Sequence, residues 1–183
     1  MAVWSRDDLV PGRLWFKIPL TLTLVLRINE GMSKHLAHLS PFAAEPIVFF
    51  TVVSAHRQKV LANDALHGIL RDIWALAGKR NGWWVGDYLL MPDHVHFFAR
   101  AGREAMPMKK WVQMWKSFSS RRWKALNGAK APLWQEDYFD RYLRNADQYS
   151  EKWSYVEANP VRKGLVERAD DWPYRGRIHE LCF

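Results

Sequence analysis

Residues 83–99, WWVGDYLLMPDHVHFFA, decide the fold of this chain. Two apolar runs, residues 83–91 and 94–99, are separated by Pro92-Asp93, a dipeptide typical of turns. Apolar runs joined by so short a connection predict two adjacent strands paired as a hairpin. We expect this hairpin to lie centrally in a β-sheet.

The second strand of this hairpin carries two histidines, His94 and His96. Residues two apart on a strand point to the same face, so both imidazoles converge while Val95 and Phe97 face the other side. Two neutral imidazoles can hold a divalent ion and leave positions open for water or a phosphate oxygen. The same pattern also occurs as an ordinary half-buried or surface pair, so the spacing alone does not establish a metal site.

On the N-terminal side of the hairpin, the β-branched and aromatic run Ile47–Val53 predicts a buried strand. Apolar residues then recur at three- and four-residue spacing, which predicts an amphipathic helix. Its candidate N-cap is Asn63 or Asp64, and Gly78 is its candidate stop. The recurring residues are Leu66, Ile69, Leu70, Ile73 and Leu76.

On the C-terminal side, a second helical repeat is closed by Asn127-Gly128, and a strand-like stretch follows over residues 133–143. A last helix is expected from about Asp147 to about Asn159, because Pro160 disfavours helical geometry at the residue before it. The order of elements predicts an α+β, ferredoxin-like antiparallel sheet with helices packed on one face. The second repeat comprises Met108, Trp111 or Val112, Trp115 and Phe118.

Length and composition are those of one folded domain. The 183 residues are 49% hydrophobic and 25% charged, which excludes a disordered chain. Residues 1–45 are broken by prolines and glycines and form a predicted N-terminal appendage, or an extension from an early start codon; residues 46–183 form the predicted domain. Cys182 is the single cysteine, so no internal disulfide is possible, and no apolar run is long enough for a membrane span. We expect a cytoplasmic protein.

A net charge of +8 points to a polyanionic partner, although a merely soluble basic protein would show it too. Residues 103–130 hold eight basic residues against Glu104 alone, with Trp111, Trp115 and Trp123 interleaved. Cations that neutralise phosphates and aromatics that stack on unpaired bases predict a nucleic-acid surface; the alternative is a solvated basic helix. The candidate DNA-binding residues are Lys109, Lys110, Lys116, Arg121, Arg122 and Lys124.

Tyr155 and Asn159 lie four residues apart on the predicted last helix, and so on one of its faces. A tyrosine nucleophile and an amide ligand could share a site there. Packing and a helix C-cap would explain the same pair.

These patterns together resemble the HUH superfamily of single-tyrosine transposases, which includes insertion-sequence transposases and REP-associated tyrosine transposases. The resemblance spans residues 47–174. Its most specific parts are MPDHVH (91–96), YVEANPVRKGLV (155–166) and DWPY (171–174), with Lys116-Ser117-Phe118 and Trp134-Gln135 before Tyr138-Phe139 in support.

The resemblance implies that His94 and His96 ligate Mg²⁺ or Mn²⁺, that Tyr155 is the nucleophile and that Asn159 completes the metal site. It implies an enzyme that nicks single-stranded DNA near hairpins through a 5′-phosphotyrosine and transfers the strand. Asparagine, where mobile insertion-sequence enzymes carry glutamine, points to the REP-associated branch. A homodimer is possible, with Tyr155 serving its own metal site or its partner's.

Three other functions fit part of the pattern. A domesticated DNA-binding protein would keep the fold and the basic helix without cutting. A metal-dependent phosphodiesterase would use water in place of Tyr155 and form no covalent adduct. An RNA-binding ferredoxin-like module would need exposed stacking aromatics on its sheet and no histidine pair. Intact His94, His96 and Tyr155 favour the nuclease.

Overall fold

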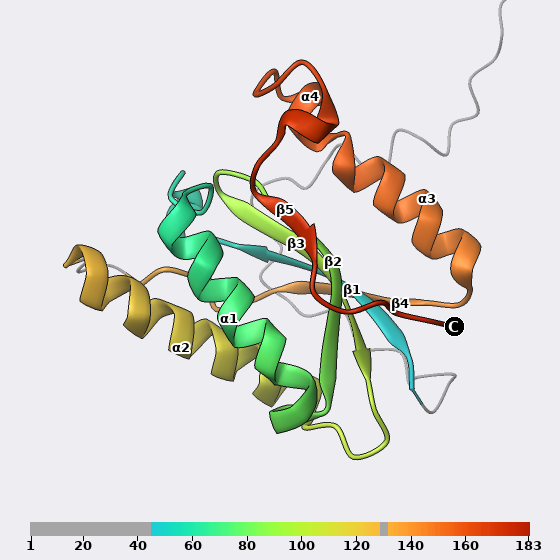
Figure 1. The fold of residues 1–183 in the computed structure, drawn as a ribbon. Helices are drawn as coiled ribbons and strands as arrows, with labels where there is room; N and C mark the ends of the chain where they lie inside the picture. The colour runs from blue at the N-terminus through green and yellow to red at the C-terminus, as the bar shows by residue number, and fades with distance from the viewer. Residues whose placement is uncertain (1–44, 129–131) are drawn as a thin grey trace, which may run out of the picture. The chain divides into compact units, whose positions relative to one another are not determined.

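A computed structural model describes residues 45–128 and 132–183 of the chain, so the predicted appendage lies outside the described residues except for Glu45. Five strands form an antiparallel sheet in the order β4-β1-β3-β2-β5, with β3 in the middle (Figure 1). The strands are β1 (Ile47–Val53), β2 (Trp83–Leu90), β3 (His94–Ala101), β4 (Phe139–Leu143) and β5 (Arg175–Arg177). The helices are α1 (Asp64–Asn81), α2 (Met108–Asn127), α3 (Ala146–Glu157) and α4 (Asn159–Arg162), with short 3₁₀ turns at Ala55–Arg57 and Ala169–Asp171.

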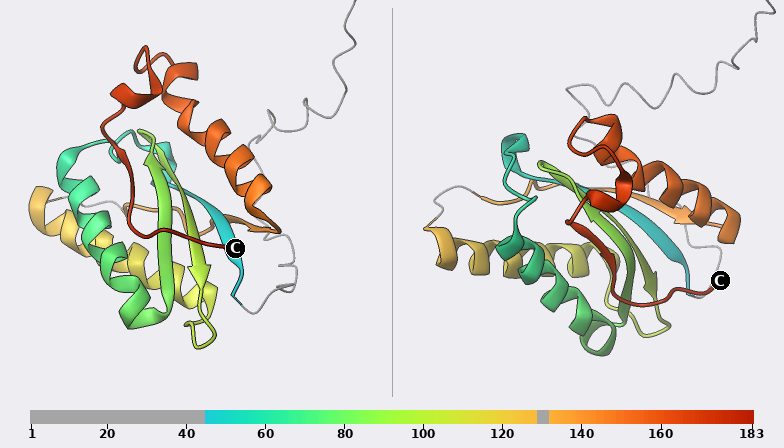
Figure 2. Two further views of the ribbon diagram at one scale, coloured as in Figure 1. Left: turned by 45° about the vertical axis from the view of Figure 1, so that its right-hand side comes forward. Right: turned by 45° about the horizontal axis from the view of Figure 1, so that its top comes forward.

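The first four strands with α1 and α2 have the predicted ferredoxin-like order, and the predicted hairpin is β2 and β3. Helices α1 and α2 cover one face of the sheet, as expected, whereas α3 covers the other (Figure 2). The expectation that all helices pack on one face was therefore wrong for α3. The physical reason is that the sheet carries apolar side chains on both faces, so helices must pack against each face to bury them.

Alternation along β1 and β3 divides the apolar residues between two cores. Phe50 and Phe97 stack at 4.8 Å between ring centroids and pack with α1 and α2, where Trp74 is fully buried. Phe49 and Phe98 point to the other face and pack with α3. Each large apolar side chain buried in this way contributes roughly 1.5–3 kcal/mol to folding.

Helix α1 begins where the sequence predicts but ends four residues later. The Asn63 side chain accepts a hydrogen bond from the backbone N–H of Leu66 at 3.0 Å. The glycine that caps the helix after Asn81 is Gly82, whose φ of 73° suits glycine, and not Gly78. Gly78 is buried within the helix, where an added Cβ would lie 2.6 Å from the indole nitrogen of Trp84. Gly78 therefore allows α1 to approach β2 closely.

The C-terminal elements also differ from the prediction. Of residues 133–143 only Phe139–Leu143 form a strand, and Trp134 makes an isolated bridge to Ser54. Helix α3 ends at Glu157, and β5, which the sequence analysis did not predict, pairs with β2 at the sheet edge. Within residues 45–128 and 132–183, no helix combines the length and apolar character that a bilayer crossing requires.

Two glycines that end helices offer a matched test of the backbone. Gly82 and Gly128 both have positive φ, at 73° and 65°. An added Cβ at Gly82 would lie 2.7 Å from the Cα of Ala105, whereas the position at Gly128 has no described atom within 4 Å. We predict that Gly128→Ala lowers the free energy of unfolding by about 1 kcal/mol, and that Gly82→Ala costs at least about 1 kcal/mol more, since backbone must move. Urea denaturation of both variants measures this, and equal losses would contradict the close approach at Ala105.

Candidate active site

The two histidines of β3 face each other on the α3 side of the sheet. Their Nε2 atoms lie 3.1 Å apart, and their rings are nearly perpendicular. His94 Nδ1 lies 2.6 Å from a carboxylate oxygen of Asp93, and His96 Nδ1 lies 2.8 Å from the hydroxyl oxygen of Thr51. With Nδ1–H donating to these oxygens, both Nε2 lone pairs are left for a common ligand.

Burial and nearby charge keep His96 in the neutral form. His96 is partly exposed as a residue, but its ring is densely surrounded by protein. This burial, followed by the nearby charges of His94, Lys152 and Arg162, lowers the pKa of His96 well below its usual value. His96 is therefore neutral at neutral pH, which is the form that ligates metals.

Asp93 holds its charge next to the pair. Its hydrogen bond to His94 is the main cause that lowers the pKa of the Asp93 carboxyl to about 2, and Arg57, at 3.0 Å, adds to it. A carboxylate bonded to the outer nitrogen of a ligating histidine fixes the ring and raises its basicity.

The donor atoms fit a divalent cation. A six-coordinate cation with ligands at about 2.1 Å places neighbouring donor atoms about 3.0 Å apart. The Nε2 atoms of His94 and His96, at 3.1 Å, match that separation. Over the residues that the structure describes, no set of three or more histidine, cysteine or acidic side chains gathers in metal-binding proximity.

Tyr155 lies on the same sheet face as the histidines. The Phe49 ring stacks on His96 at 5.5 Å, and the Lys152 ammonium lies 5.3 Å from the Phe49 centroid and 5.7 Å from the Tyr155 centroid. The Arg162 guanidinium stacks on the Tyr155 ring, with its central carbon 4.0 Å from the ring centroid. Tyr155 is 46% exposed, so a molecule in solution can reach its side chain.

Asn159 is placed differently from the prediction. The helix breaks at Ala158, so Asn159 begins α4 and does not continue the helix that carries Tyr155. Pro160 is buried in the first turn of α4, where its missing N–H is tolerated. The Asn159 amide oxygen accepts a hydrogen bond from Arg162, which also donates to the backbone oxygen of Tyr155 at 2.9 Å. A metal would therefore have to compete with Arg162 for this amide.

The candidate DNA-binding residues lie on α2, which packs on the opposite face of the sheet from the histidines. Trp111 and Trp115 are fully buried in the core there and cannot stack on bases, which leaves Trp123, half-buried, as the tryptophan of this helix that a base could reach. Arg122 pairs with Asp72 at 3.4 Å, and Lys130 lies outside the described residues. The candidates that remain exposed on α2 are Lys109, Lys110, Arg121, Arg122 and Lys124.

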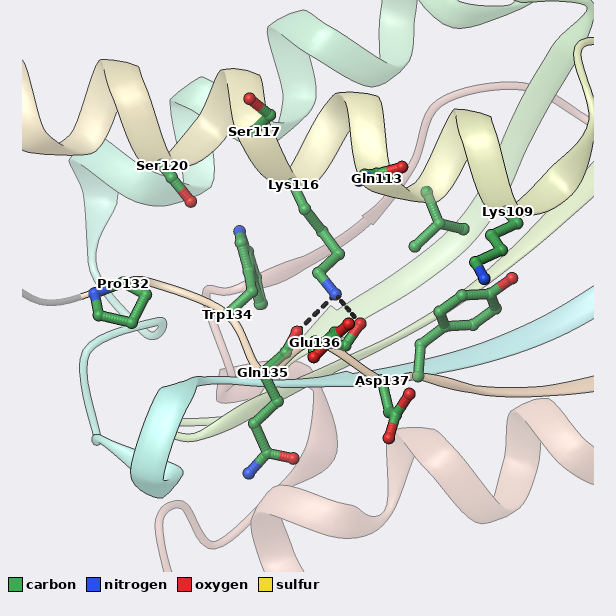
Figure 3. Close-up of a pocket in the computed structure, with 12 residues that line it drawn as sticks. Lys109, Gln113, Lys116, Ser117, Ser120, Pro132, Trp134, Gln135, Glu136 and Asp137 are labelled. Carbon is green, nitrogen blue, oxygen red and sulfur yellow. Dashed lines mark hydrogen bonds between the residues drawn. The ribbon is translucent and has the colours of Figure 1, made fainter. Parts of the chain in front are cut away.

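Lys116 turns away from solvent into a pocket between α2 and residues 132–138 (Figure 3). Its ammonium donates hydrogen bonds to the backbone oxygens of Gln135 at 2.5 Å and Glu136 at 2.7 Å. Burial lowers the pKa of Lys116 to about 8, so the charge is kept at neutral pH. These bonds tie α2 to the segment that leads into β4.

Sequence reasoning missed several residues that shape the site. Thr51 could have been found only from the register of β1 on β3, which places it opposite His96. A buried carboxylate, Asp87, accepts a hydrogen bond from the Tyr149 hydroxyl at 2.6 Å and a bidentate pair from Arg177 at 2.8 and 2.9 Å. This network joins α3 to β2 and β5, and it rests on contacts distant in sequence.

An antiparallel ferredoxin-like sheet with two histidines on its central strand, and a tyrosine on a helix over the same face, defines the HUH class of single-tyrosine proteins. The family model described as "Transposase IS200 like" matches residues 47–159, and this chain belongs to that family. The resemblance seen in the sequence is confirmed.

Two relatives extend this finding. The REP-associated tyrosine transposase of Escherichia coli (strain K12) is 24% identical over 127 residues, which cover 69% of this chain and 73% of that protein. A solved structure of a REP-associated tyrosine transposase bound to a REP hairpin matches with a TM-score of 0.60 at 19% identity, covering 77% of this chain and 82% of the other. This structural likeness confirms the fold.

The position of Lys116 predicts a structural role that its exposed neighbour lacks. Lys116→Met should lower the free energy of unfolding by about 1–3 kcal/mol, because two backbone oxygens lose a charged donor. Lys110→Met should change it by less than about 0.5 kcal/mol, since Lys110 is exposed. Urea denaturation measures both, and hydrogen exchange should be faster in residues 133–138 of the Lys116 variant alone. Equal stability of the two variants would contradict the anchoring role.

Proposed function

We propose that this protein nicks and rejoins single-stranded DNA next to hairpins, with Tyr155 as the nucleophile and a divalent metal held by His94 and His96. The observation that carries the proposal is the convergence of the paired imidazoles and an exposed tyrosine on one sheet face. Family membership supports the same chemistry. REP-type hairpins are the proposed substrate, because a relative of the same fold is bound to one.

In the proposed reaction the Tyr155 hydroxyl oxygen attacks the scissile phosphorus. The Tyr–O–P bond forms as the bond from phosphorus to the 3′-oxygen breaks, which leaves a 5′-phosphotyrosine and a free 3′-hydroxyl. The phenol gives up its proton during the attack, and the leaving 3′-oxygen takes one up. Because no water is consumed, the 3′-hydroxyl of a second strand can reverse the step and complete strand transfer.

The residues around Tyr155 hold and neutralise the phosphate. Mg²⁺ or Mn²⁺, when bound by the histidines, would supply positive charge to a non-bridging phosphate oxygen. Lys152 and Arg162 flank Tyr155 and bring two more cations to the place where negative charge develops. Asn159 stays our proposed further metal ligand, once its amide is released from Arg162.

The exposed cations of α2 are proposed to contact DNA away from the scissile phosphate. They lie on the opposite face of the sheet from Tyr155, so one strand cannot be held by both surfaces over a short distance. The hairpin that flanks the cut is the part of the substrate that suits this surface, since phosphate contacts position a duplex without reading its sequence.

The nucleophile is tested by incubating the protein with labelled hairpin DNAs that carry single-stranded tails, in the presence of Mn²⁺. We expect a covalent protein–DNA band on a denaturing gel. The band should be lost in Tyr155→Phe and in His96→Ala, and kept in Tyr142→Phe, because Tyr142 packs with the core on the other sheet face.

Two other outcomes would contradict this assignment. Hairpin binding without any covalent band in the intact protein would favour the domesticated DNA-binding function. Cleavage that persists in Tyr155→Phe without a covalent band would favour attack by water.

The metal site is tested through Thr51, whose hydroxyl orients His96. Thr51→Val keeps the side-chain shape but removes the partner of His96 Nδ1, and loss of such a partner weakens metal binding about 10- to 100-fold. Isothermal titration with Mn²⁺ measures the affinity directly. Ser117→Ala, which removes an exposed hydroxyl from α2, is the control and should bind Mn²⁺ like the parent. Unchanged affinity in Thr51→Val would count against a metal on His96.

A further inference from the structure

A row of side chains runs from the histidines to the edge of the sheet. His96 on β3 pairs with Thr51 on β1, and Thr51 pairs with Phe139 on β4. Residues directly opposite each other on neighbouring strands project to the same face. With strands about 4.8 Å apart, the backbone of Phe139 lies roughly 10 Å from that of His96.

The neighbouring row brings positive charge to the same place. Arg141 on β4 pairs with Phe49 on β1, whose ring stacks on His96. The Lys152 ammonium lies over that same Phe49 ring. Arg141 is close enough to contribute to the lowered pKa of Lys152, after burial as the main cause. Two cations and an aromatic ring therefore border the histidine site on its β4 side.

Phe139 is 51% exposed although it lies on the sheet face whose core packs with α3. An exposed aromatic ring beside cations is the combination that binds unpaired nucleotides, because bases stack on the ring and phosphates contact the cations. Nothing in the reaction at Tyr155 itself requires an aromatic residue at this edge.

We propose that Phe139, Arg141 and Lys152 bind the single-stranded DNA segment next to the scissile phosphate, with one unpaired base stacked on Phe139 and phosphates held by Arg141 and Lys152. This binding track rests on the proposed function, because its ligand is the single-stranded DNA that Tyr155 is proposed to cut. It runs along the α3 face of the sheet and is separate from the cations of α2.

A second copy of this chain is the competing occupant. Among the described residues β4 is an edge strand of the sheet, and edge strands are the ones through which two copies of a chain can pair. An aromatic ring and an aliphatic side chain would serve such an interface about equally, whereas base stacking needs the ring. Replacing Phe139 by leucine or by tyrosine separates the two occupants.

The test uses the full chain carrying Tyr155→Phe, so that binding is measured without cleavage. A hairpin with a single-stranded tail is prepared in a series that has one abasic site moved along the tail, and its affinity is measured at fixed salt. We expect one tail position at which loss of the base weakens binding about tenfold. Adding Phe139→Leu should weaken binding of the intact tail by a similar factor and abolish the effect of that abasic site. Adding Phe139→Tyr in place of Phe139→Leu should keep both the affinity for the intact tail and the effect of the abasic site.

Arg141→Gln should leave the abasic profile unchanged. It should reduce the slope of log affinity against log salt concentration by about one, because one phosphate contact is lost. Phe183→Leu, which changes another exposed phenylalanine, should match the parent in every assay.

The track is refuted if no tail position is sensitive, or if Phe139→Leu keeps the same abasic profile. A dimer by light scattering in both the parent and Phe139→Leu, together with an unchanged abasic profile, would assign the edge to a second copy. Failure of the proposed function would appear separately, as absence of the covalent band in the protein with Tyr155 intact.

Discussion

The pairing of β1 with β3 is the constraint on which the rest of this structure depends. It places Thr51 opposite His96, and it directs alternate residues of both strands to opposite faces. Val95 and Phe97 are thereby fully buried with α1 and α2, while His94 and His96 reach the other face. A slip of one residue would exchange the two sets, burying imidazoles in an apolar core and exposing aromatic rings. Folding and the candidate site therefore require the same register.

The second requirement is that α3 stays over the histidine face. The apolar contacts of Val156 contribute to this, and so does the buried network of Asp87, Tyr149 and Arg177. Burial, followed by the hydrogen bond to Asp87, raises the pKa of Tyr149, so it remains a hydrogen-bond donor to Asp87 across the physiological range. Removing one partner would leave a buried charge without compensation, which is costly. The position of Tyr155 thus depends on residues that lie outside the candidate site.

Much of the fold could be predicted because its signals are local. The apolar run of Ile47–Val53 and the turn at Pro92-Asp93 determine β1 and the hairpin. Strand alternation alone places His94 and His96 on the same face of the sheet. Gly78 was misassigned as a helix stop because its buried approach to Trp84 is a tertiary contact. The contacts of Thr51 and Lys116 and the place of Phe139 beside the histidine site could not be predicted for the same reason, since each depends on a partner from a distant strand or segment.

The most direct test of the account is to identify the residue that becomes attached to DNA. The protein is incubated with a tailed hairpin and Mn²⁺, then digested with protease and nuclease, and the nucleotide-bearing peptide is sequenced by mass spectrometry. The account predicts a single modified residue, Tyr155, linked to a 5′-phosphate. A nucleotide on another tyrosine, such as Tyr142, or cleaved DNA with no modified peptide, would contradict it.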